Sequence, residues 1–144
     1  MCLLCFMRIA VLSVFSPYRG GIAQFNQSMC AAFESEGHEV LKVNFSRQYP
    51  QLLFPGKSQF KGSEKAMENA LLDSINPLSW NRTARFISNF EPDLLVVPFW
   101  QPLLLPALTA TIKSTKAQIP KMRVIGLLHN ATSHESQFFA AYLI

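Results

Sequence analysis

Charged residues are scarce in this chain and form no runs. Only 15% of the 144 residues are charged, and the 13 lysine and arginine residues outnumber the 9 acidic residues to give a net charge of +4. Domains that bind nucleic acid gather their basic residues into a patch or stripe. The scattered basic residues therefore argue against nucleic acid as a partner, whereas a mild positive charge is compatible with peripheral contact with an anionic membrane surface or with sugar phosphates.

Cysteine is also rare. The three cysteines are Cys2, Cys5 and Cys30. Cys2 and Cys5 form a C-x-x-C motif, but no second pair follows it, and a structural zinc site needs about four ligands. We therefore expect no metal site. An odd number of cysteines without the spacing of a disulfide framework is typical of a reducing compartment.

Long apolar runs and targeting signals are missing as well. No apolar run reaches the roughly 20 residues of a membrane-spanning helix. The apolar opening lacks a basic start, is interrupted by Arg8 and is not followed by a small-residue cleavage site, so it does not match a signal peptide. These absences predict a cytoplasmic protein. Met7 is a natural start, which makes residues 1–6 a candidate upstream extension, and residues 7–144 are expected to form one domain, incomplete at its C-terminal end.

Hydrophobic residues make up 49% of the chain, and their spacing alternates between two patterns. Short apolar runs with many β-branched residues predict buried strands at residues 7–14, 40–45, 94–99 and 121–129. Apolar positions at helical spacing predict helices at residues 21–36, 64–72, 77–90, 103–116 and 137–144. A long irregular stretch occupies residues 46–63. The alternation predicts an α/β fold with a Rossmann-like, doubly wound, mostly parallel sheet and helices on both faces.

Ligands of such sheets bind at the carboxyl ends of the strands, so the residues just after the predicted strands are the candidates for a site. After the first strand comes the sequence Ser-Pro-Tyr-Arg-Gly-Gly, which ends in Gly20 and Gly21 at the start of a helix. Glycine lets the backbone approach a ligand closely, and the N-terminus of a helix favours an anion such as a phosphate. A simple tight turn explains the two glycines equally well.

After the fourth predicted strand come His129, His134 and Glu135. Histidine titrates near neutral pH and can donate a hydrogen bond to a sugar or a phosphate. The position of His129 at the carboxyl end of a strand favours a functional role over a structural one, and Glu135 is close enough in the sequence to tune it. The spacing lacks the one-face pair of histidines of a metalloprotease helix.

Two common functions of doubly wound sheets are disfavoured. A nicotinamide-dinucleotide site needs the pattern G-x-G-x-x-G in the first loop and an acidic residue at the end of the second strand, but this loop has a different sequence and Asn44 stands at the strand end. A receiver-type phosphoacceptor domain needs an acidic pair after the first strand and an aspartate after the third, where Pro98, Phe99 and Trp100 stand instead.

Several motifs, taken in order, resemble the opening of the family 4 glycosyltransferases of the GT-B fold. They are the first strand, the loop that ends in Gly20 and Gly21, the amphipathic helix, the Gly-His-Glu-Val sequence at residues 37–40, the Glu-Pro-Asp sequence at residues 91–93 and the His-Asn pair that starts at His129. The resemblance extends from about Met7 to His134.

This resemblance implies a hexosyltransferase with two Rossmann-like domains that face a cleft, and with no metal or other cofactor. Such an enzyme moves a sugar from a nucleotide-sugar donor to a glycan or lipid-linked acceptor, with retention of the anomeric configuration. The resemblance places the backbone amides of Gly20 and Gly21 near the donor's phosphate or transferred sugar, and makes His129 the catalytic residue at the sugar. It assigns to the acceptor side Arg47, Tyr49, Trp100, His134 and Glu135.

The sequence departs from this family in one respect. The donor nucleotide of these enzymes is held mainly by the C-terminal domain, through a pair of glutamates and basic residues, whereas this chain ends inside the apolar segment at residues 138–144. We therefore expect a truncated, acceptor-side domain that is inactive on its own. The alternative interpretation is a non-catalytic Rossmann-like domain that binds a ligand or a partner.

Overall fold

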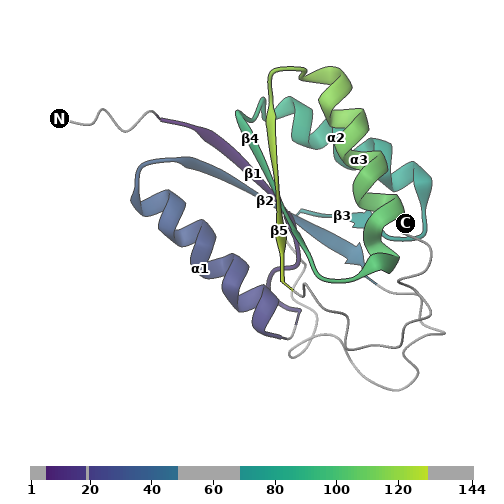
Figure 1. Ribbon diagram of the computed structural model, residues 1–144, viewed down its shortest axis with the longest axis horizontal. Helices are drawn as coiled ribbons and strands as arrows, with labels where there is room; N and C mark the ends of the chain where they lie inside the picture. Colours follow the sequence, from purple (N-terminus) through teal and green to yellow (C-terminus); the bar gives the residue numbers. More distant parts are fainter. Residues whose placement is uncertain (1–5, 19, 49–68, 130–144) are drawn as a thin grey trace.

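A parallel β-sheet between two layers of helices forms the body of the protein (Figure 1). The computed structural model describes residues 6–18, 20–48 and 69–129. The helix α1 covers one face of the sheet, and α2 and α3 cover the other. Along the chain the elements are β1 (Arg8–Ser13), α1 (Gly21–Ser35), β2 (Glu39–Arg47), β3 (Ala70–Asp73), α2 (Pro77–Asn89), β4 (Leu94–Phe99), the short 3-10 helix η2 (Pro102–Leu104), α3 (Leu105–Gln118) and β5 (Arg123–Leu128).

The strands run in the order β3-β2-β1-β4-β5, and every neighbouring pair within the described residues is parallel. This is the order of the first five strands of a doubly wound Rossmann sheet, so the predicted fold class is confirmed. The direction in which successive strands are added reverses between β1 and β4. Ligands of such sheets bind outside the carboxyl ends of the strands at this reversal.

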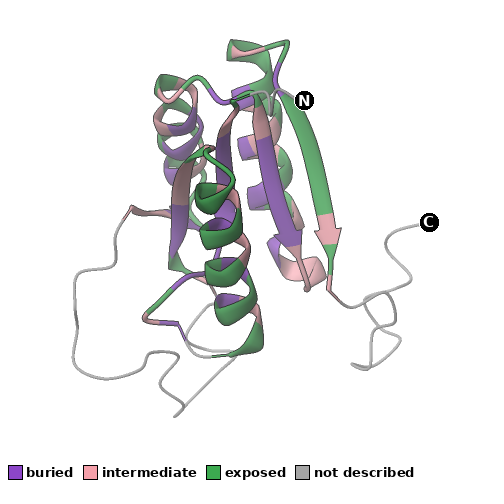
Figure 2. Ribbon diagram, turned by 90° about the vertical axis from the view of Figure 1, so that its left-hand side faces the viewer, coloured by how far each residue is buried: buried purple, intermediate pink, exposed green. Residues whose placement is uncertain are grey.

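The central strand β1 explains why the sheet has a core on both faces. Its alternate side chains point to opposite faces, and its last five residues are all buried. Ile9 and Val11 pack with Cys30 on the side of α1, whereas Ala10 and Leu12 belong to the larger core on the side of α2 and α3. Figure 2 shows the buried residues gathered along the inner strands and on the sides of the helices that face them. A nearly continuous apolar run is what this position requires.

The ends of α1 and α2 follow the sequence signals. Gly37 follows α1 with a φ of +87°, a conformation that residues with a side chain rarely adopt. The N-cap of α2 is Asn76, whose side-chain oxygen accepts a hydrogen bond from the backbone N–H of Leu78 at 3.1 Å. Pro77 occupies the first turn, where its missing N–H has no helical partner to lose. Both predicted boundaries are confirmed to within a residue or two.

The helix predicted at residues 64–72 is wrong in the part that the structure describes. Residues Ala70–Asp73 form β3, which pairs with β2 in parallel, and residues 64–68 lie outside the described residues. Leu72 is fully buried in the core, in register with Phe45. Sheet pairing and burial of this leucine outweigh a weak helical preference, which is how tertiary structure overrides local propensity.

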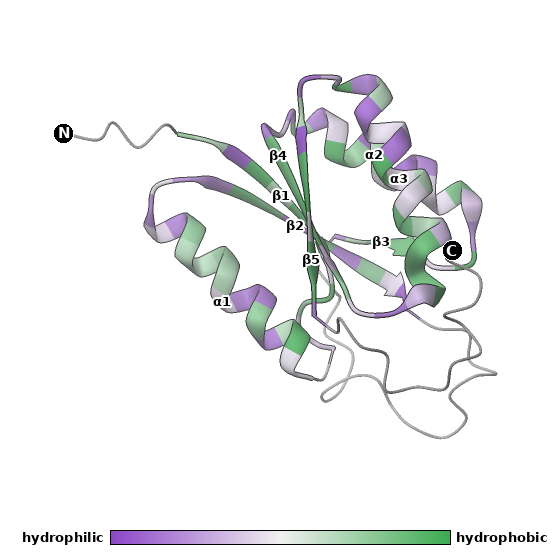
Figure 3. Cartoon of the chain, in the orientation of Figure 1, coloured by the Kyte–Doolittle hydropathy of each residue, from purple (hydrophilic) through white to green (hydrophobic). Residues whose placement is uncertain are grey.

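The strand β5 is the second departure from expectation. The apolar sequence predicts a strand buried like the others, but five of its six residues are exposed and the sixth is partly buried. β5 lies at an edge of the sheet, and β4 is its strand neighbour. It is largely hydrophobic (Figure 3) and yet exposed (Figure 2), with Leu128 69% exposed. The apolar residue pattern of β5 predicts that this segment forms a strand. The position of the strand in the sheet, and with it its burial, depends on the rest of the chain.

We expect Asn76→Ala to lower the free energy of unfolding by about 1 kcal/mol, because the variant loses the side-chain acceptor for the first turn of α2. Asn81→Ala is the matched control, since Asn81 is an exposed residue inside the same helix, where alanine has the higher helix propensity. Urea denaturation followed by circular dichroism measures both variants. Equal stabilities of the two would contradict the capping role of Asn76.

Candidate functional site

The loop between β1 and α1 lies at the carboxyl edge of the sheet, where the strand order reverses. Gly20 is the N-cap of α1 and has a φ of +126°, which favours glycine. Within the described residues no side chain caps this helix, and its first turn contains no acidic residue. Gly20 and Gly21 are both exposed. The first backbone N–H groups of α1 therefore lack a side-chain acceptor, and the helix dipole adds a partial positive charge there.

Asn26 fixes α1 to the end of β1. It is fully buried, and its side-chain nitrogen donates to Ser13 Oγ at 2.7 Å and to the carbonyl of Val14 at 2.9 Å. Its side-chain oxygen Oδ1 has no hydrogen-bond partner in the part of the chain that the structure describes. The two bonds that Asn26 makes hold the second turn of α1 against the strand. Asn26 therefore sets where the N-terminus of α1 lies relative to β1.

Asn44 holds the start of the same loop from the neighbouring strand β2. It is 1% exposed, and its Oδ1 accepts hydrogen bonds from the backbone N–H of Phe15 at 3.2 Å and of Phe45 at 3.0 Å. Asn44 stands where a nicotinamide site would carry an acidic residue. Here the amide joins the second strand to the loop, so its role is to position the backbone.

His129 follows β5 and packs against the second turn of α1. Its ring meets that of Phe25 edge-on, with 4.9 Å between the ring centroids, and its backbone N–H donates to the carbonyl of Phe99 at 2.9 Å. The ring nitrogen Nε2 is buried and has no hydrogen-bond partner among the described residues. Phe25 follows Gly21 by about one helical turn, which is roughly 6 Å along the helix axis. The structure therefore brings His129 and the two glycines, all predicted from the sequence, to the same end of α1.

The predicted acceptor residues Arg47 and Trp100 lie at the same carboxyl edge but in a second group. Arg47 ends β2 and forms an ion pair with Asp73 at the end of β3, with 2.9 Å between Nη2 and Oδ2. The Trp100 ring packs edge-on against Phe45, with 6.3 Å between centroids. Tyr18 joins this group, because its hydroxyl donates to the carbonyl of Phe45 at 3.0 Å. The carboxyl edge of the sheet therefore has two groups of candidate residues. One group surrounds the start of α1, and the other surrounds the end of β2.

The remaining predicted residues, Tyr49, His134 and Glu135, lie outside the described residues, so their assignment to an acceptor site stays a prediction. Sequence reasoning missed Asn26 and Asp73. The signal for Asn26 was a polar residue on the buried face of an amphipathic helix, where it lies with Ala23 and Cys30. Asp73 offered no local signal, because its partner arginine is distant in the sequence.

Two motifs that carry the family resemblance lie at the opposite, amino edge of the sheet. Arg8, at the start of β1, forms an ion pair with Glu39 at 3.0 Å, and its backbone N–H donates to Asp93 Oδ2 at 2.8 Å. Its guanidinium also lies 4.5 Å from the centre of the Phe90 ring. The Gly-His-Glu-Val and Glu-Pro-Asp motifs therefore join the first ends of β1, β2 and β4, which supports the fold rather than chemistry.

Residues 6–18, 20–48 and 69–129 contain neither a membrane span nor a metal-binding cluster. No helix there combines the length and the apolar character that crossing a bilayer requires. Histidine, cysteine, aspartate and glutamate side chains do not come together there in groups of three or more that could hold a metal ion.

The strand order and the helices on both faces define the class of this protein as a Rossmann-like α/β domain. No family model, curated protein or solved structure matches the chain. The resemblance to glycosyltransferases therefore stays a prediction, and the function has to be argued from the residues and the geometry of the site.

Burial raises the pKa of two side chains, Tyr18 and Cys30. Burial, with the nearby Asp73 carboxylate adding to its effect, raises the pKa of Tyr18 to about 12. Burial also raises the pKa of the Cys30 thiol to about 11, an effect that the Lys42 ammonium opposes and the Glu34 carboxylate reinforces. Both side chains are therefore neutral at physiological pH. Neither supplies a base or a thiolate nucleophile there.

We expect the free energy of unfolding to fall as the pH rises from 10 to 12, because the folded protein holds the Tyr18 proton above its ordinary pKa of 10.0. In this window the folded state binds more protons than the unfolded state, and the total loss is at most about 3 kcal/mol. Tyr18→Phe removes this decline and leaves the one due to Cys30, which runs from pH 9.0 to about 11. Denaturant unfolding at a series of pH values measures both. A variant curve parallel to the wild-type curve above pH 10 would contradict the burial of this hydroxyl.

Proposed function

We propose that this chain is the acceptor-side, Rossmann-like domain of a hexosyltransferase, which moves a sugar from a nucleotide-sugar donor to a glycan or lipid-linked acceptor with retention of configuration. The family resemblance of the sequence supports the proposal. The structural observation that carries it is the packing of His129 about one helical turn from Gly20 and Gly21, at the edge where the strand order reverses. On this proposal turnover needs a second, donor-binding domain, and the enzyme works in the cytoplasm in peripheral contact with the membrane.

The start of α1 receives the donor's phosphate in this proposal. Exposed backbone N–H groups at a helix N-terminus bind phosphate through hydrogen bonds and through the helix dipole. The first turn of α1 has no acidic residue to repel such an anion. The φ of +126° at Gly20 is reserved for glycine in practice, so the approach to these amides carries no side chain at that position.

His129 contacts the transferred sugar in this proposal. Its Nε2 atom is buried without a partner in the described part of the chain, and such an atom gains free energy from a hydrogen bond to a ligand. A neutral imidazole donates from one nitrogen and accepts at the other, so His129 can bond a sugar hydroxyl. A hydrogen-bond donor at this position can also stabilise the negative charge that develops as the nucleotide leaves.

We assign the acceptor to the group of residues around the end of β2, at the carboxyl edge of the sheet. The Trp100 ring offers an apolar surface, and Arg47 keeps guanidinium donors beyond those that its ion pair with Asp73 uses. Tyr49, His134 and Glu135 are also assigned to the acceptor, and the resemblance to the glycosyltransferase family supports their assignment.

The test uses α-D-glucose 1-phosphate, a probe that has both a sugar and a phosphate, together with UDP-glucose and GDP-mannose. In the ¹⁵N-labelled chain we expect these ligands to shift the amide signals of Gly20 and Gly21 and the imidazole signals of His129. His129→Ala is expected to weaken the binding of glucose 1-phosphate about tenfold, as the loss of one hydrogen bond to a charged or polar group predicts. Incubation of the chain with the nucleotide sugars and glycan acceptors is expected to release no nucleotide.

The matched control is His38→Ala, because His38 directly precedes β2 at the amino edge of the sheet. Its affinity for the probe is expected to equal that of the wild type. Binding that is unchanged in His129→Ala, or signal shifts confined to the amino edge, would contradict the proposed site. Sugar transfer by the chain alone would contradict the need for a second domain.

A further inference from the structure

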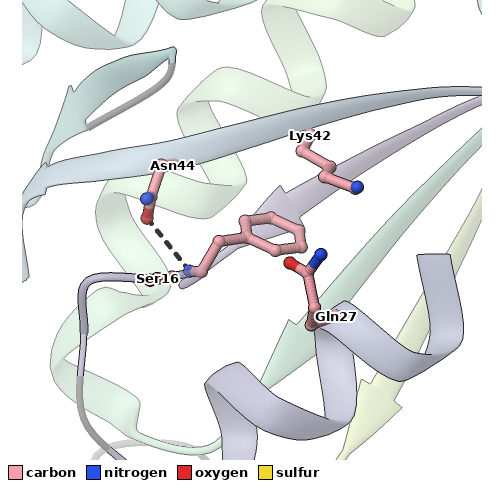
Figure 4. A pocket seen from close by; sticks show the side chains of 5 residues that line it. Ser16, Gln27, Lys42 and Asn44 are labelled. Carbon is pink, nitrogen blue, oxygen red and sulfur yellow. Dashed lines mark hydrogen bonds between the residues drawn. The ribbon is translucent and has the colours of Figure 1, made fainter. Parts of the chain in front are cut away.

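A small pocket lies on the α1 side of the sheet, between that helix and the carboxyl halves of β1 and β2. It has a volume of about 240 Å³ and is lined by Phe15, Ser16, Gln27, Lys42 and Asn44. Figure 4 shows Lys42 reaching from β2, and Gln27 from α1, toward the same space. Roughly eight water molecules would fill such a volume. A ligand of this pocket therefore has to be small.

The polar groups around the pocket are rich in unused hydrogen-bond donors. The Oδ1 atom of Asn44 accepts two backbone hydrogen bonds, but its side-chain NH₂ group has no acceptor among the described residues. Asn44 is 1% exposed, and it lines the pocket. Ser16 and Gln27 are exposed residues, and their side chains likewise make no hydrogen bond within the described residues. Donors without a protein partner are available to an acceptor that enters the pocket.

The charge of Lys42 indicates which acceptor fits. Its Nζ atom lies 3.3 Å from Glu34 Oε1, and its side chain is 26% exposed, against 47% for that of Glu34. Glu34 does not line the pocket. An ammonium has three N–H donors, so the ion pair leaves Lys42 with donors for a ligand. A partly buried ammonium with amide and hydroxyl donors around it matches a negatively charged oxygen acceptor.

We propose that this pocket binds a small oxyanion, a carboxylate or phosphate group on a compact molecule, through the Lys42 ammonium and the side-chain amides of Gln27 and Asn44. The buried Phe15 ring supplies an apolar wall for the carbon atoms of such a molecule. Because the ligand and Glu34 compete for the same ammonium, the ion pair limits the affinity. The site is independent of the proposed glycosyltransferase function, since it uses neither His129 nor the two glycines.

The experiment titrates the ¹⁵N-labelled chain with sodium benzoate and, separately, with inorganic phosphate. We expect at least one of the two probes to shift the side-chain amide signals of Gln27 and Asn44. Lys42→Gln is expected to weaken the binding about tenfold or more, because it removes the charged donor among the described residues that line the pocket. Glu34→Gln is expected to strengthen the binding several-fold, because it removes the competing carboxylate. A gain of affinity cannot come from a variant that fails to fold.

The matched control is Lys113→Gln, which removes the same charge from an exposed position of α3 on the other face of the sheet. Lys113→Gln and His129→Ala are both expected to bind the probes as the wild type does, which separates this site from the proposed sugar site. Benzoate binding alone identifies carboxylates as the ligand class, and phosphate binding alone identifies phosphates. The proposal is overturned if neither probe shifts the two amide signals, or if Lys42→Gln and Glu34→Gln both keep the wild-type affinity.

Discussion

Burial of β1 between β2 and β4 is the constraint on which the rest of the structure depends. A strand with neighbours on both sides and helices on both faces has to be apolar nearly throughout. A slip of one residue would exchange its two faces and bring every side chain to the wrong layer. The register is therefore fixed, with Ser13 beside Asn44 and Val11 beside Val96. The point at which the chain leaves β1, and with it the start of α1, follows from this register.

The fold could be predicted from the sequence wherever the signal was local. The turn at Gly37 and the cap at Asn76 depend on backbone conformation and on a hydrogen bond within a few residues, so the residue types alone indicated them. The strand at Leu72 and the exposure of Leu128 depend on which strand lies alongside, and no pattern within either segment contains that information. The same limit applies to the site. Its positions at strand ends were predictable, but the contact of His129 with Phe25 joins residues far apart in the chain.

The motifs behind the family resemblance divide between the two edges of the sheet. Glu39 and Asp93 act through Arg8 and hold the first ends of three strands together, whereas His129 and the two glycines lie at the carboxyl edge. Residues that support an architecture occur in proteins of many functions, because one fold hosts many sites. The amino-edge motifs therefore favour the fold more strongly than the chemistry. The proposed function depends on the smaller set of residues around the start of α1.

The loop at the start of α1 is held by two asparagines, and this choice of residue has a consequence for how the protein responds to its surroundings. Asn26 and Asn44 are neutral, buried and bonded to backbone or hydroxyl groups. Side-chain amides do not titrate, and hydrogen bonds between neutral buried groups are little affected by dissolved ions. The loop therefore keeps its position over ranges of acidity and ionic strength that weaken exposed ion pairs. Any dependence of ligand affinity on ionic strength therefore reports on charged contacts such as that of Lys42, and not on a rearranged backbone.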